Sequence, residues 1–425
     1  MSLSTTPYKG ARDFYPEDMQ TQNYIFSLWR EVAKSFGYVE YNAPIIEPIE
    51  LYLSKTSEEI INEQTYAFED RGGRKVTLRP EMTPTVSRMI AGKRQELAYP
   101  VRWFSIPNLW RYERPQKGRL REHWQLNMDL FGVKGVEADH ELIYIADSIM
   151  QRFGAQRDMY TICINSRKLI NYILQGILKL DKEQCQKTIR LIDKMHKMET
   201  DNFTALLKNV CGDKTEELIC ILSCQTLQAL PDDVKLNDSY KEIHNLEMML
   251  ARNGVTNADF DITLMRGFDY YTDIVFEVFD ANPENNRSIF GGGRYDGLIG
   301  QFDVEPVPTV GFGMGDVTFH EFLNSHKLLP DIKYDVDINV ILIGDVYQPA
   351  QVVVKQLREG GLSVAIDSTK RKMDKQIQSA VKAGYPFVLF IGEQELEAGQ
   401  FNLKELATGQ EQKLTIEQII DTIKS

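Results

Sequence analysis

The spacing of apolar residues predicts a helix followed by a strand at the start of the chain. Over 18–36, apolar side chains recur every three or four residues, which is typical of an amphipathic helix. Gly37 follows directly and should end that helix. The stretch 38–48 then predicts a strand. Because Pro44 lacks a backbone N–H, this strand is restricted to the edge or the end of a sheet.

The polar and apolar pattern predicts an antiparallel sheet in the middle of the chain. Two strands are expected within 101–133, joined by a basic loop that contains glycine, and such a hairpin makes neighbouring strands antiparallel. A strand should lead into a helix over 75–90, and a helix over 137–153 should precede a strand over 160–165. The pattern from about 167 to 255 is helical and charged, which predicts an inserted helical module.

Strand character returns after this module, and the rhythm changes again near the C-terminus. A strand is expected over 260–280, and a later strand should run into a helix with Asp316 as its N-cap. After a linker at 330–335, strands and helices alternate as in a small α/β domain with a largely parallel sheet. The sequence therefore predicts an α+β protein with one domain over 1–330 and a second over 335–425.

The composition is that of a globular protein without a membrane span. Hydrophobic residues make up 43% of the chain, and no apolar run approaches the roughly 20 residues that a bilayer requires. The N-terminal segment lacks the apolar core of a signal peptide, so a cytoplasmic location is expected. The cysteines include no C-x-x-C pair and the histidines do not cluster, so no metal site is expected. The net charge of −12 restricts nucleic-acid contacts to local basic patches.

A run of arginines in the 101–133 hairpin is the densest chemical signal. The stretch RYERPQKGRLR holds Arg111, Arg114, Arg119 and Arg121. Guanidinium groups match the geometry of phosphates and carboxylates and keep their charge, so this loop could bind a polyphosphate. A solvated charged turn is the alternative, although the flanking apolar strands should hold the base of the loop against a sheet.

The stretch LMRGFDYYTDIVFEVF carries polar residues inside a segment that otherwise looks like a buried strand. On a regular strand, Arg266 and Tyr270 would share one face, and Tyr271 would lie on the other. A buried arginine is costly unless it is paired. One interpretation is an ion pair of Arg266 with Asp269 or Glu277. The other is a cation that binds phosphate, with tyrosine hydroxyls that hold a polar substrate.

Together these motifs resemble the histidyl-tRNA synthetase family of class II aminoacyl-tRNA synthetases over nearly the whole chain. FGYVEYNAPIIEP is similar to class II motif 1, and WRYERPQKGRLREHWQ is similar to motif 2. MRGFDYYTDIVFE and GGGRYDGL are similar to two motifs of the histidine-specific members, and the C-terminal α/β segment resembles their anticodon-binding domain. The resemblance implies an antiparallel catalytic sheet, a homodimer, and a reaction in which ATP activates L-histidine for transfer to tRNA(His).

The resemblance also implies roles for individual residues. The residues expected to bind histidine are Glu81, Thr83, Gln125, Asp129, Tyr271, Tyr295 and Arg266. The residues expected to bind ATP are Arg111, Glu113 and Arg119. Arg111 and Arg266 would be catalytic, because this chemistry depends on positioning and on neutralising charge at the α-phosphate. Magnesium (Mg²⁺) should arrive with ATP and keep several waters.

Two positions depart from the family pattern. Asp129 stands where glutamate is usual, so contact with an imidazole should need a backbone shift or a water. Thr318 stands where motif 3 normally carries an arginine for the ATP γ-phosphate, and a threonine cannot supply that charge. Another cation should take its place. The candidates are Arg119, Arg121, Lys117 and Arg74.

Two other functions stay open at the level of sequence. The change at Thr318 slightly favours a non-catalytic relative such as the regulatory subunit of ATP phosphoribosyltransferase, although that subunit generally lacks a C-terminal domain of this kind. The second alternative is a synthetase-like RNA-binding protein that charges no tRNA. For tRNA itself, the basic candidates are the segments 369–376 and 116–121, and a charged turn would explain the first equally well.

Overall fold

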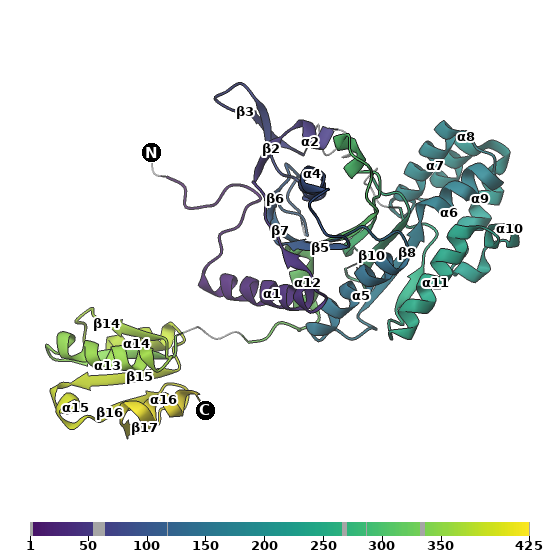
Figure 1. Ribbon diagram of the computed structural model, residues 1–425. Helices are drawn as coiled ribbons and strands as arrows, with labels where there is room; N and C mark the ends of the chain where they lie inside the picture. Colours follow the sequence, from purple (N-terminus) through teal and green to yellow (C-terminus); the bar gives the residue numbers. More distant parts are fainter. Residues whose placement is uncertain are drawn as a thin grey trace. The chain divides into compact units, whose positions relative to one another are not determined.

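The chain divides into two compact units. One consists of Met1–Phe14 and Gln22–Leu329, and the other of Tyr15–Thr21 and Pro330–Ser425. Figure 1 shows this computed structural model. The residues that it describes are 3–53, 64–116, 118–265, 270–285, 287–331 and 336–424. Most of the predicted linker at 330–335 lies outside these residues, and the domain boundaries placed there stay a prediction.

Among the described residues, nine strands form the main sheet of the larger unit. They are β1 (Val39–Glu40), β5 (Val101–Ser105), β6 (Asn108–Trp110), β7 (Glu122–Phe131), β8 (Tyr160–Ser166), β9 (Ala258–Phe260), β10 (Ile274–Asp280), β11 (Ser288–Arg294) and β12 (Thr309–Gly315). Their order is β1-β5-β7-β12-β11-β10-β8-β9, with β6 beside β7. All pairs are antiparallel except β1 with β5 and β8 with β9. The predicted antiparallel sheet is therefore confirmed.

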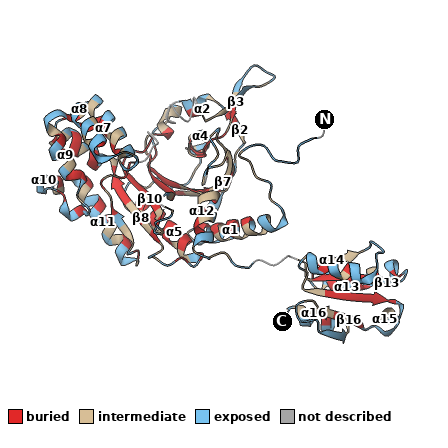
Figure 2. Ribbon diagram, turned by 180° about the vertical axis from the view of Figure 1, so that it is seen from behind, coloured by how far each residue is buried: buried red, intermediate tan, exposed pale blue. Residues whose placement is uncertain are grey.

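Helices cover one face of this sheet. Alternate residues of a strand point to opposite faces, and in β7 and β12 the helix-facing set is apolar: Leu126, Met128, Leu130, Val310, Phe312 and Met314. The helices that pack there are α1 (Pro16–Ser35), α5 (Glu137–Arg152) and α12 (Asp316–Ser325). The Trp29 and Phe319 rings meet at a centroid distance of 5.6 Å. Figure 2 shows buried residues along the central strands and exposed residues on the outer surfaces of the helices.

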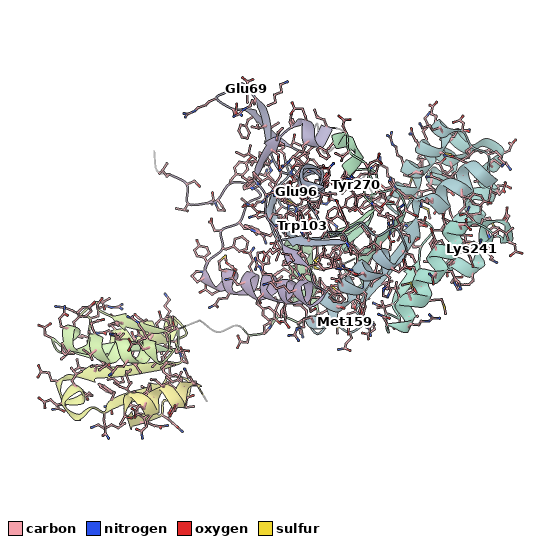
Figure 3. The ribbon with its side chains drawn as sticks, viewed as in Figure 1. Glu69, Glu96, Trp103, Met159, Lys241 and Tyr270 are labelled. Atoms are coloured by element: carbon pink, nitrogen blue, oxygen red, sulfur yellow. The ribbon has the colours of Figure 1, made fainter. Side chains whose placement is uncertain are left out.

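The remaining elements of the larger unit form a small second sheet with a helix after it, and a helical module. A small antiparallel sheet pairs β2 (Ile46–Pro48), β4 (Lys75–Leu78) and β3 (Tyr66–Glu69), and α4 (Thr83–Lys93) follows it. Between β8 and β9 lies a helical module with its own apolar core, in the region where the insertion was predicted. Its α-helices are α6 (Arg167–Asn171), α7 (Lys182–Lys194), α8 (Thr200–Cys211), α9 (Thr215–Leu222), α10 (Asp232–Lys235) and α11 (Asp238–Arg252). Figure 3 labels Lys241 on this module and Tyr270 near the middle of the unit.

The predicted strand over 260–280 is wrong over the described residues 261–265 and 270–273, which belong to no strand, while 266–269 lie outside the described residues. Its backbone leaves β9 at Phe260 and turns, because the Asp261 carboxylate accepts the backbone N–H of Thr263 at 2.9 Å and the Asp261 carbonyl accepts that of Leu264 at 3.1 Å. Among the described residues that follow, regular pairing is found with β10 from Ile274. Tyr270 and Tyr271 both line one cavity, so the prediction that they lie on opposite faces is wrong.

Two further details differ from the sequence predictions. The segment 38–48 forms the two short strands β1 and β2 in place of one strand. Asp316 is the first residue of α12 and not its N-cap, which is Gly315. The Asp316 carboxylate instead accepts the backbone N–H of Trp124 at 2.9 Å and pairs with Arg12 at 2.6 Å, so it joins the helix to β7.

The smaller unit combines parallel and antiparallel strands. Parallel pairing links β13 (Ile338–Ile343) to β14 (Val364–Asp367) and β15 (Phe387–Gly392), with α13 (Tyr347–Glu359) and α14 (Met373–Lys382) as connections. This half follows the prediction. Four elements were not predicted from the sequence: α15 (Glu393–Ala398), α16 (Ile416–Lys424) and the antiparallel pair β16 (Phe401–Glu405) and β17 (Glu411–Leu414). In the ranges that the structure describes, no helix has the length and apolarity needed to cross a bilayer.

Candidate active site

Glycines of β12 make room for polar side chains of the neighbouring strand β7. Gly311 lies opposite Asp129, and Gly313 lies opposite Asn127. A side-chain carbon on Gly311 would lie 2.3 Å from Asp129 Oδ1, and one on Gly313 would lie 2.8 Å from Gln125 Cδ. Both distances are shorter than any ordinary contact. These glycines therefore allow Asp129 and Gln125 to lie flat on the face of the sheet opposite the helices.

A small cavity lies over this glycine floor. Tyr295 donates a hydrogen bond to Asp129, and Tyr270 donates one to Glu81 at 3.1 Å. The side chains that line the cavity come from β7, the segment before α4 and the segments around β10 and β11. They include Glu81, Thr83, Arg111, Gln125, Asn127, Asp129, Tyr270, Tyr271 and Tyr295. Such a pocket presents carboxylates, an amide and hydroxyls to a small polar ligand.

Burial sets the charge of the Asp129 carboxyl. It raises the pKa of Asp129 to about 7, and the hydrogen bond from Tyr295 opposes that rise. Burial is also the main reason that the pKa of Tyr295 lies well above its ordinary value, and the Asp129 charge adds to it. Tyr295 therefore stays a hydroxyl donor, while Asp129 changes its charge near neutral pH.

A larger cavity of about 740 Å³ adjoins the first one. Arg111 donates its Nε–H to the Pro80 carbonyl at 2.8 Å, and Arg119 pairs with Glu113 at 3.4 Å. The charged side chains that line the cavity are Arg111, Glu113, Arg119, Asp193, Lys194, Lys197 and Glu277. Its volume falls in the range typical of ligand sites. The excess of cations suits an anionic ligand.

Arg111 and Gln125 line both cavities. The guanidinium of Arg111 therefore lies where a ligand in the small cavity would meet a ligand in the large one. Because a guanidinium binds both carboxylates and phosphates, this place suits a reaction between those two groups.

The structure brings nearly all the predicted site residues together. The small cavity contains each residue predicted to bind histidine except Arg266, and the large cavity contains all three predicted to bind ATP. Arg266 lies outside the described residues. Residues that the sequence analysis did not assign also line the two cavities: Asn127, Tyr270, His123, Lys194 and Lys197. Asn127 could have been found from its alternation with Gln125 and Asp129, whereas the lysines lie in a charged helical stretch that gives no signal.

The cations considered as substitutes for a motif 3 arginine are mostly engaged elsewhere. Arg74 pairs with Asp70 at 2.7 Å beside the turn between β3 and β4. Arg121 lies 4.0 Å from the centre of the Tyr112 ring and donates to the Glu113 carbonyl. Neither lines the large cavity, although Arg119 does. Lys117 lies outside the described residues.

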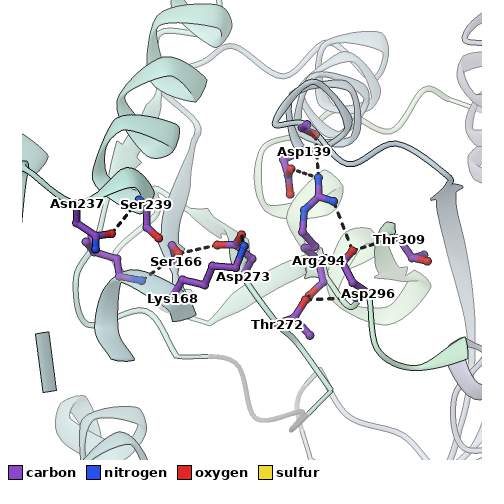
Figure 4. Close-up of polar contacts among 12 residues, drawn as sticks. Asp139, Ser166, Lys168, Asn237, Ser239, Thr272, Asp273, Arg294, Asp296 and Thr309 are labelled. Atoms are coloured by element: carbon purple, nitrogen blue, oxygen red, sulfur yellow. Dashed lines mark hydrogen bonds and ion pairs between the residues drawn. The ribbon is translucent and has the colours of Figure 1, made fainter. Parts of the chain in front are cut away.

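Arg294, from the GGGRYDG motif, lies behind the site and fixes the sheet to α5. It pairs with Asp139, donates to the Asp296 carboxylate at 3.4 Å, and donates to the Gly135 carbonyl at 2.9 Å (Figure 4). The side chain of Arg294 is 4% exposed. The Asp296 carboxylate in turn accepts the backbone N–H of Thr309 at 2.9 Å. This network holds the two strands that carry the glycine floor.

We expect Arg294→Ala to destabilise the larger unit by about 3–5 kcal/mol, because it leaves the buried Asp139 carboxylate without its partner. Thermal unfolding followed by tryptophan fluorescence measures the effect. Arg152→Ala is the control, since Arg152 pairs with Glu31 at the surface and such pairs contribute about 0–1 kcal/mol. Equal unfolding midpoints for the two variants would contradict the structural role of Arg294.

Within the described residues, no three His, Cys, Asp or Glu side chains form a cluster that could hold a metal ion.

Comparisons with known proteins agree with the geometry of the site. The family model "Histidyl-tRNA synthetase" matches residues 10–315, and the model "Anticodon binding domain" matches 337–425.

Relatives match over almost the full length of the chain. A histidine–tRNA ligase of Leptospira biflexa is 41% identical over 429 residues, which covers 99% of this chain and 98% of the relative. One of Haloarcula marismortui is 35% identical over 415 residues, which covers 95% and 94%. The crystal structure of histidyl-tRNA synthetase from a Nostoc species shares the fold, with a TM-score of 0.84 at 22% identity, and the match covers 100% of this chain and 99% of that one.

The antiparallel sheet, its paired cavities and the C-terminal anticodon-binding domain define a class II aminoacyl-tRNA synthetase. The family follows from the matches to the sequence. The chain belongs to the histidyl-tRNA synthetase family.

Proposed function

We propose that the chain activates L-histidine with ATP and transfers the histidine to tRNA(His). The observation that carries this proposal is the position of Arg111, which lines a small polar cavity and a large cationic one at once. Histidine would occupy the small cavity and ATP the large one. Their carboxylate and α-phosphate would then meet at Arg111.

The reaction needs two displacements. A carboxylate oxygen of histidine attacks the α-phosphorus, the bond to the bridging oxygen breaks, and diphosphate leaves with the electron pair. A hydroxyl at the 3′ end of tRNA then attacks the carbonyl carbon, AMP leaves and the hydroxyl proton is released. Arg111 would neutralise the charge that builds up on the α-phosphate, together with Arg266. Asp129, Tyr271 and Tyr295 would surround the imidazole, while Glu81, Thr83 and Gln125 would bind the α-amino end.

ATP would enter with Mg²⁺ as its counter-ion. The carboxylates of Glu113 and Glu277 line the large cavity and offer the oxygen ligands that this ion prefers. Magnesium usually keeps several waters and takes only one or two carboxylates from the protein. The cavity therefore suits an ion that arrives with the nucleotide.

The non-catalytic alternatives are not favoured. Relatives that cover 95–99% of the chain at 35–41% identity are named histidine–tRNA ligase. The C-terminal anticodon-binding domain supports contact with tRNA, for which Arg371 and Lys372 remain the basic candidates. We also propose a homodimer, because Val39 and Ile46 in the motif 1 segment are 64% and 46% exposed in the single chain. These substrates favour a cytoplasmic location.

Exchange of radioactive pyrophosphate into ATP tests the proposal directly. We expect exchange to require histidine and Mg²⁺ and to be absent with other amino acids. Purified tRNA(His) should then accept histidine with release of AMP. A protein that binds ATP but shows neither reaction would contradict the proposal, and exchange without charging would restrict the function to histidine activation.

A further inference from the structure

Three segments that are distant in the sequence meet at the rim of the large cavity. They are the turn at Gly118, the first turn of α12 at Thr318, and Arg287 just before β11. A side-chain carbon on Gly118 would lie 3.4 Å from Thr318 Cγ2 and 3.9 Å from Arg287 Nη1. Gly118, Thr318 and Ser288 all line the cavity. The Arg287 guanidinium is thus close to Thr318 and next to a residue of the cavity wall.

The geometry of this rim is fixed by hydrogen bonds. Thr318 donates its hydroxyl to the Ile289 carbonyl at 2.7 Å, which fastens α12 to β11 two residues after Arg287. On the loop, the backbone groups of Gln116 and Arg119 bond each other at 3.0 and 2.9 Å and close the turn around Gly118. Thr318 itself is uncharged and its hydroxyl is already used, so it offers nothing to an anion. Arg287 brings a guanidinium to the same point beside Gly118 that Thr318 approaches.

The direction of a bound nucleotide points to the same place. Arg111 lies at the junction of the two cavities, where the α-phosphate would react. The β- and γ-phosphates would then extend away from the histidine cavity, along the wall of the large cavity that includes Gly118 and Thr318. Arg119 lies on that wall, but it already faces the Glu113 carboxylate at 3.4 Å. A triphosphate carries more negative charge than one such cation can balance, and the other cations of this cavity, Lys194 and Lys197, come from the helical module and not from the Gly118 rim.

We propose that Arg287 binds the terminal phosphates of ATP and supplies, from the segment before β11, the charge that Thr318 lacks. This inference rests on the proposed function. To replace the charge of an arginine at position 318, the guanidinium of Arg287 must reach the space beside the Thr318 side chain. The side chains of Arg287 and Thr318 do approach the same point beside Gly118.

A competing explanation involves Glu321. Its Oε2 lies 3.5 Å from the same point beside Gly118, so Arg287 could serve only to balance a surface carboxylate. The two explanations predict opposite results for Glu321→Gln. If Arg287 only balances Glu321, this variant should resemble Arg287→Ala. If Arg287 binds phosphate, Glu321→Gln should bind ATP as well as the unsubstituted protein or better.

Steady-state pyrophosphate exchange with Arg287→Ala tests the inference. We expect the KM for ATP to rise about 10- to 100-fold, as for loss of a charged hydrogen bond. The KM for histidine and the affinity for AMP, which has no terminal phosphates, should stay within about twofold. Arg287→Gln should behave in the same way while keeping the length of the side chain. Arg252→Ala, on the exposed end of α11, is the control.

A rescue variant makes the test sharper. Adding Thr318→Arg to Arg287→Ala should return most of the ATP affinity, because it restores a guanidinium to the same volume from α12. An ATP KM within about twofold of the unsubstituted protein in both Arg287 variants overturns the inference, as does an equal defect in Glu321→Gln. Absence of histidine-dependent exchange in the unsubstituted protein would instead overturn the proposed function.

Discussion

Arg111→Ala should lower histidine-dependent pyrophosphate exchange by about 10³-fold, because removal of a fixed cation or donor from a developing charge typically costs about 10²–10³ or more in rate. The geometry explains why this substitution has the largest effect expected for any described residue. Arg111 lines both cavities, and its Nε–H bond to the Pro80 carbonyl holds the guanidinium in place. Loss of the Arg111 guanidinium would leave both the histidine carboxylate and the α-phosphate without the cation that neutralises them.

The measurement separates rate from binding. We expect kcat to fall more than the KM values rise, since the charge on the α-phosphate is greatest in the transition state. Arg111→Lys should recover only part of the loss, because an ammonium group cannot bind two groups with the planar fork of a guanidinium. Arg114→Ala is the matched control, because Arg114 is exposed on the same loop and lines neither cavity. Equal activity of the Arg111 and Arg114 variants would exclude Arg111 from the reaction.

The site residues were predicted from the resemblance to the histidyl-tRNA synthetase family, and the local strand pattern explains why two of them lie together. Alternation along β7 places Gln125 and Asp129 on one face, and the strand pairing of β7 with β12 then puts glycines opposite them. These contacts need only the period of a strand and the identity of its neighbour. The main sheet and the helical module could be predicted for the same reason, since each depends on the spacing of apolar residues along a continuous segment.

The sequence predictions failed where a side chain overrides the local pattern. The apolar residues around Leu264 suggest a strand, but Asp261 closes a turn that ends the pairing of β9. Asp-x-Thr is a known turn signal, and it could have been read as one. In the C-terminal unit, Gly409 adopts a positive φ of 74° in the turn between β16 and β17. A glycine is a turn signal, but the hairpin that it indicates was not predicted.

Contacts between distant segments could not be predicted from the sequence alone. GGGRYDG suggests a site motif, yet Arg294 points behind the sheet to Asp139 on α5. Arg287 attracts no attention in the sequence, because a lone arginine before a strand is usually a solvated charge. Its relevance depends on the approach of Gly118 and Thr318, which are separated from it by whole elements of the fold.

The second large effect is expected for histidine recognition. Asp129→Asn should raise the KM for histidine by about 10²-fold, because a buried carboxylate that accepts an imidazole N–H contributes about 1.5–3 kcal/mol. The amide oxygen can still accept the hydrogen bond from Tyr295, so the pocket should keep its shape. The KM for ATP is the internal control and should stay within about twofold. If the KM for histidine also changes by less than about twofold, the imidazole does not bind beside Asp129.

The same variant should change the pH dependence of histidine use. Burial raises the pKa of Asp129 to about 7, so its carboxyl becomes protonated as the pH falls through neutrality and then no longer accepts a hydrogen bond at both oxygens. In the unsubstituted protein, kcat/KM for histidine should therefore fall as the pH is lowered from about 8 to 6, beyond the fall caused by protonation of free histidine itself, whose imidazole titrates near about 6.5. In Asp129→Asn, kcat/KM for histidine should fall only as far as protonation of free histidine requires.

Stability should respond to pH in the opposite sense to histidine binding. Because the pKa of Asp129 is higher in the folded protein than in the unfolded chain, the folded state binds more protons between about pH 4 and 7, and its stability decreases as the pH rises through that interval. Asp129→Asn removes this dependence, so the variant should gain thermal stability relative to the unsubstituted protein as the pH increases from about 5 to 8. Thermal unfolding at both pH values measures the difference. Parallel pH profiles for the two proteins would mean that the Asp129 carboxyl is not destabilised by burial, and the pH dependence expected for histidine use would lose its cause.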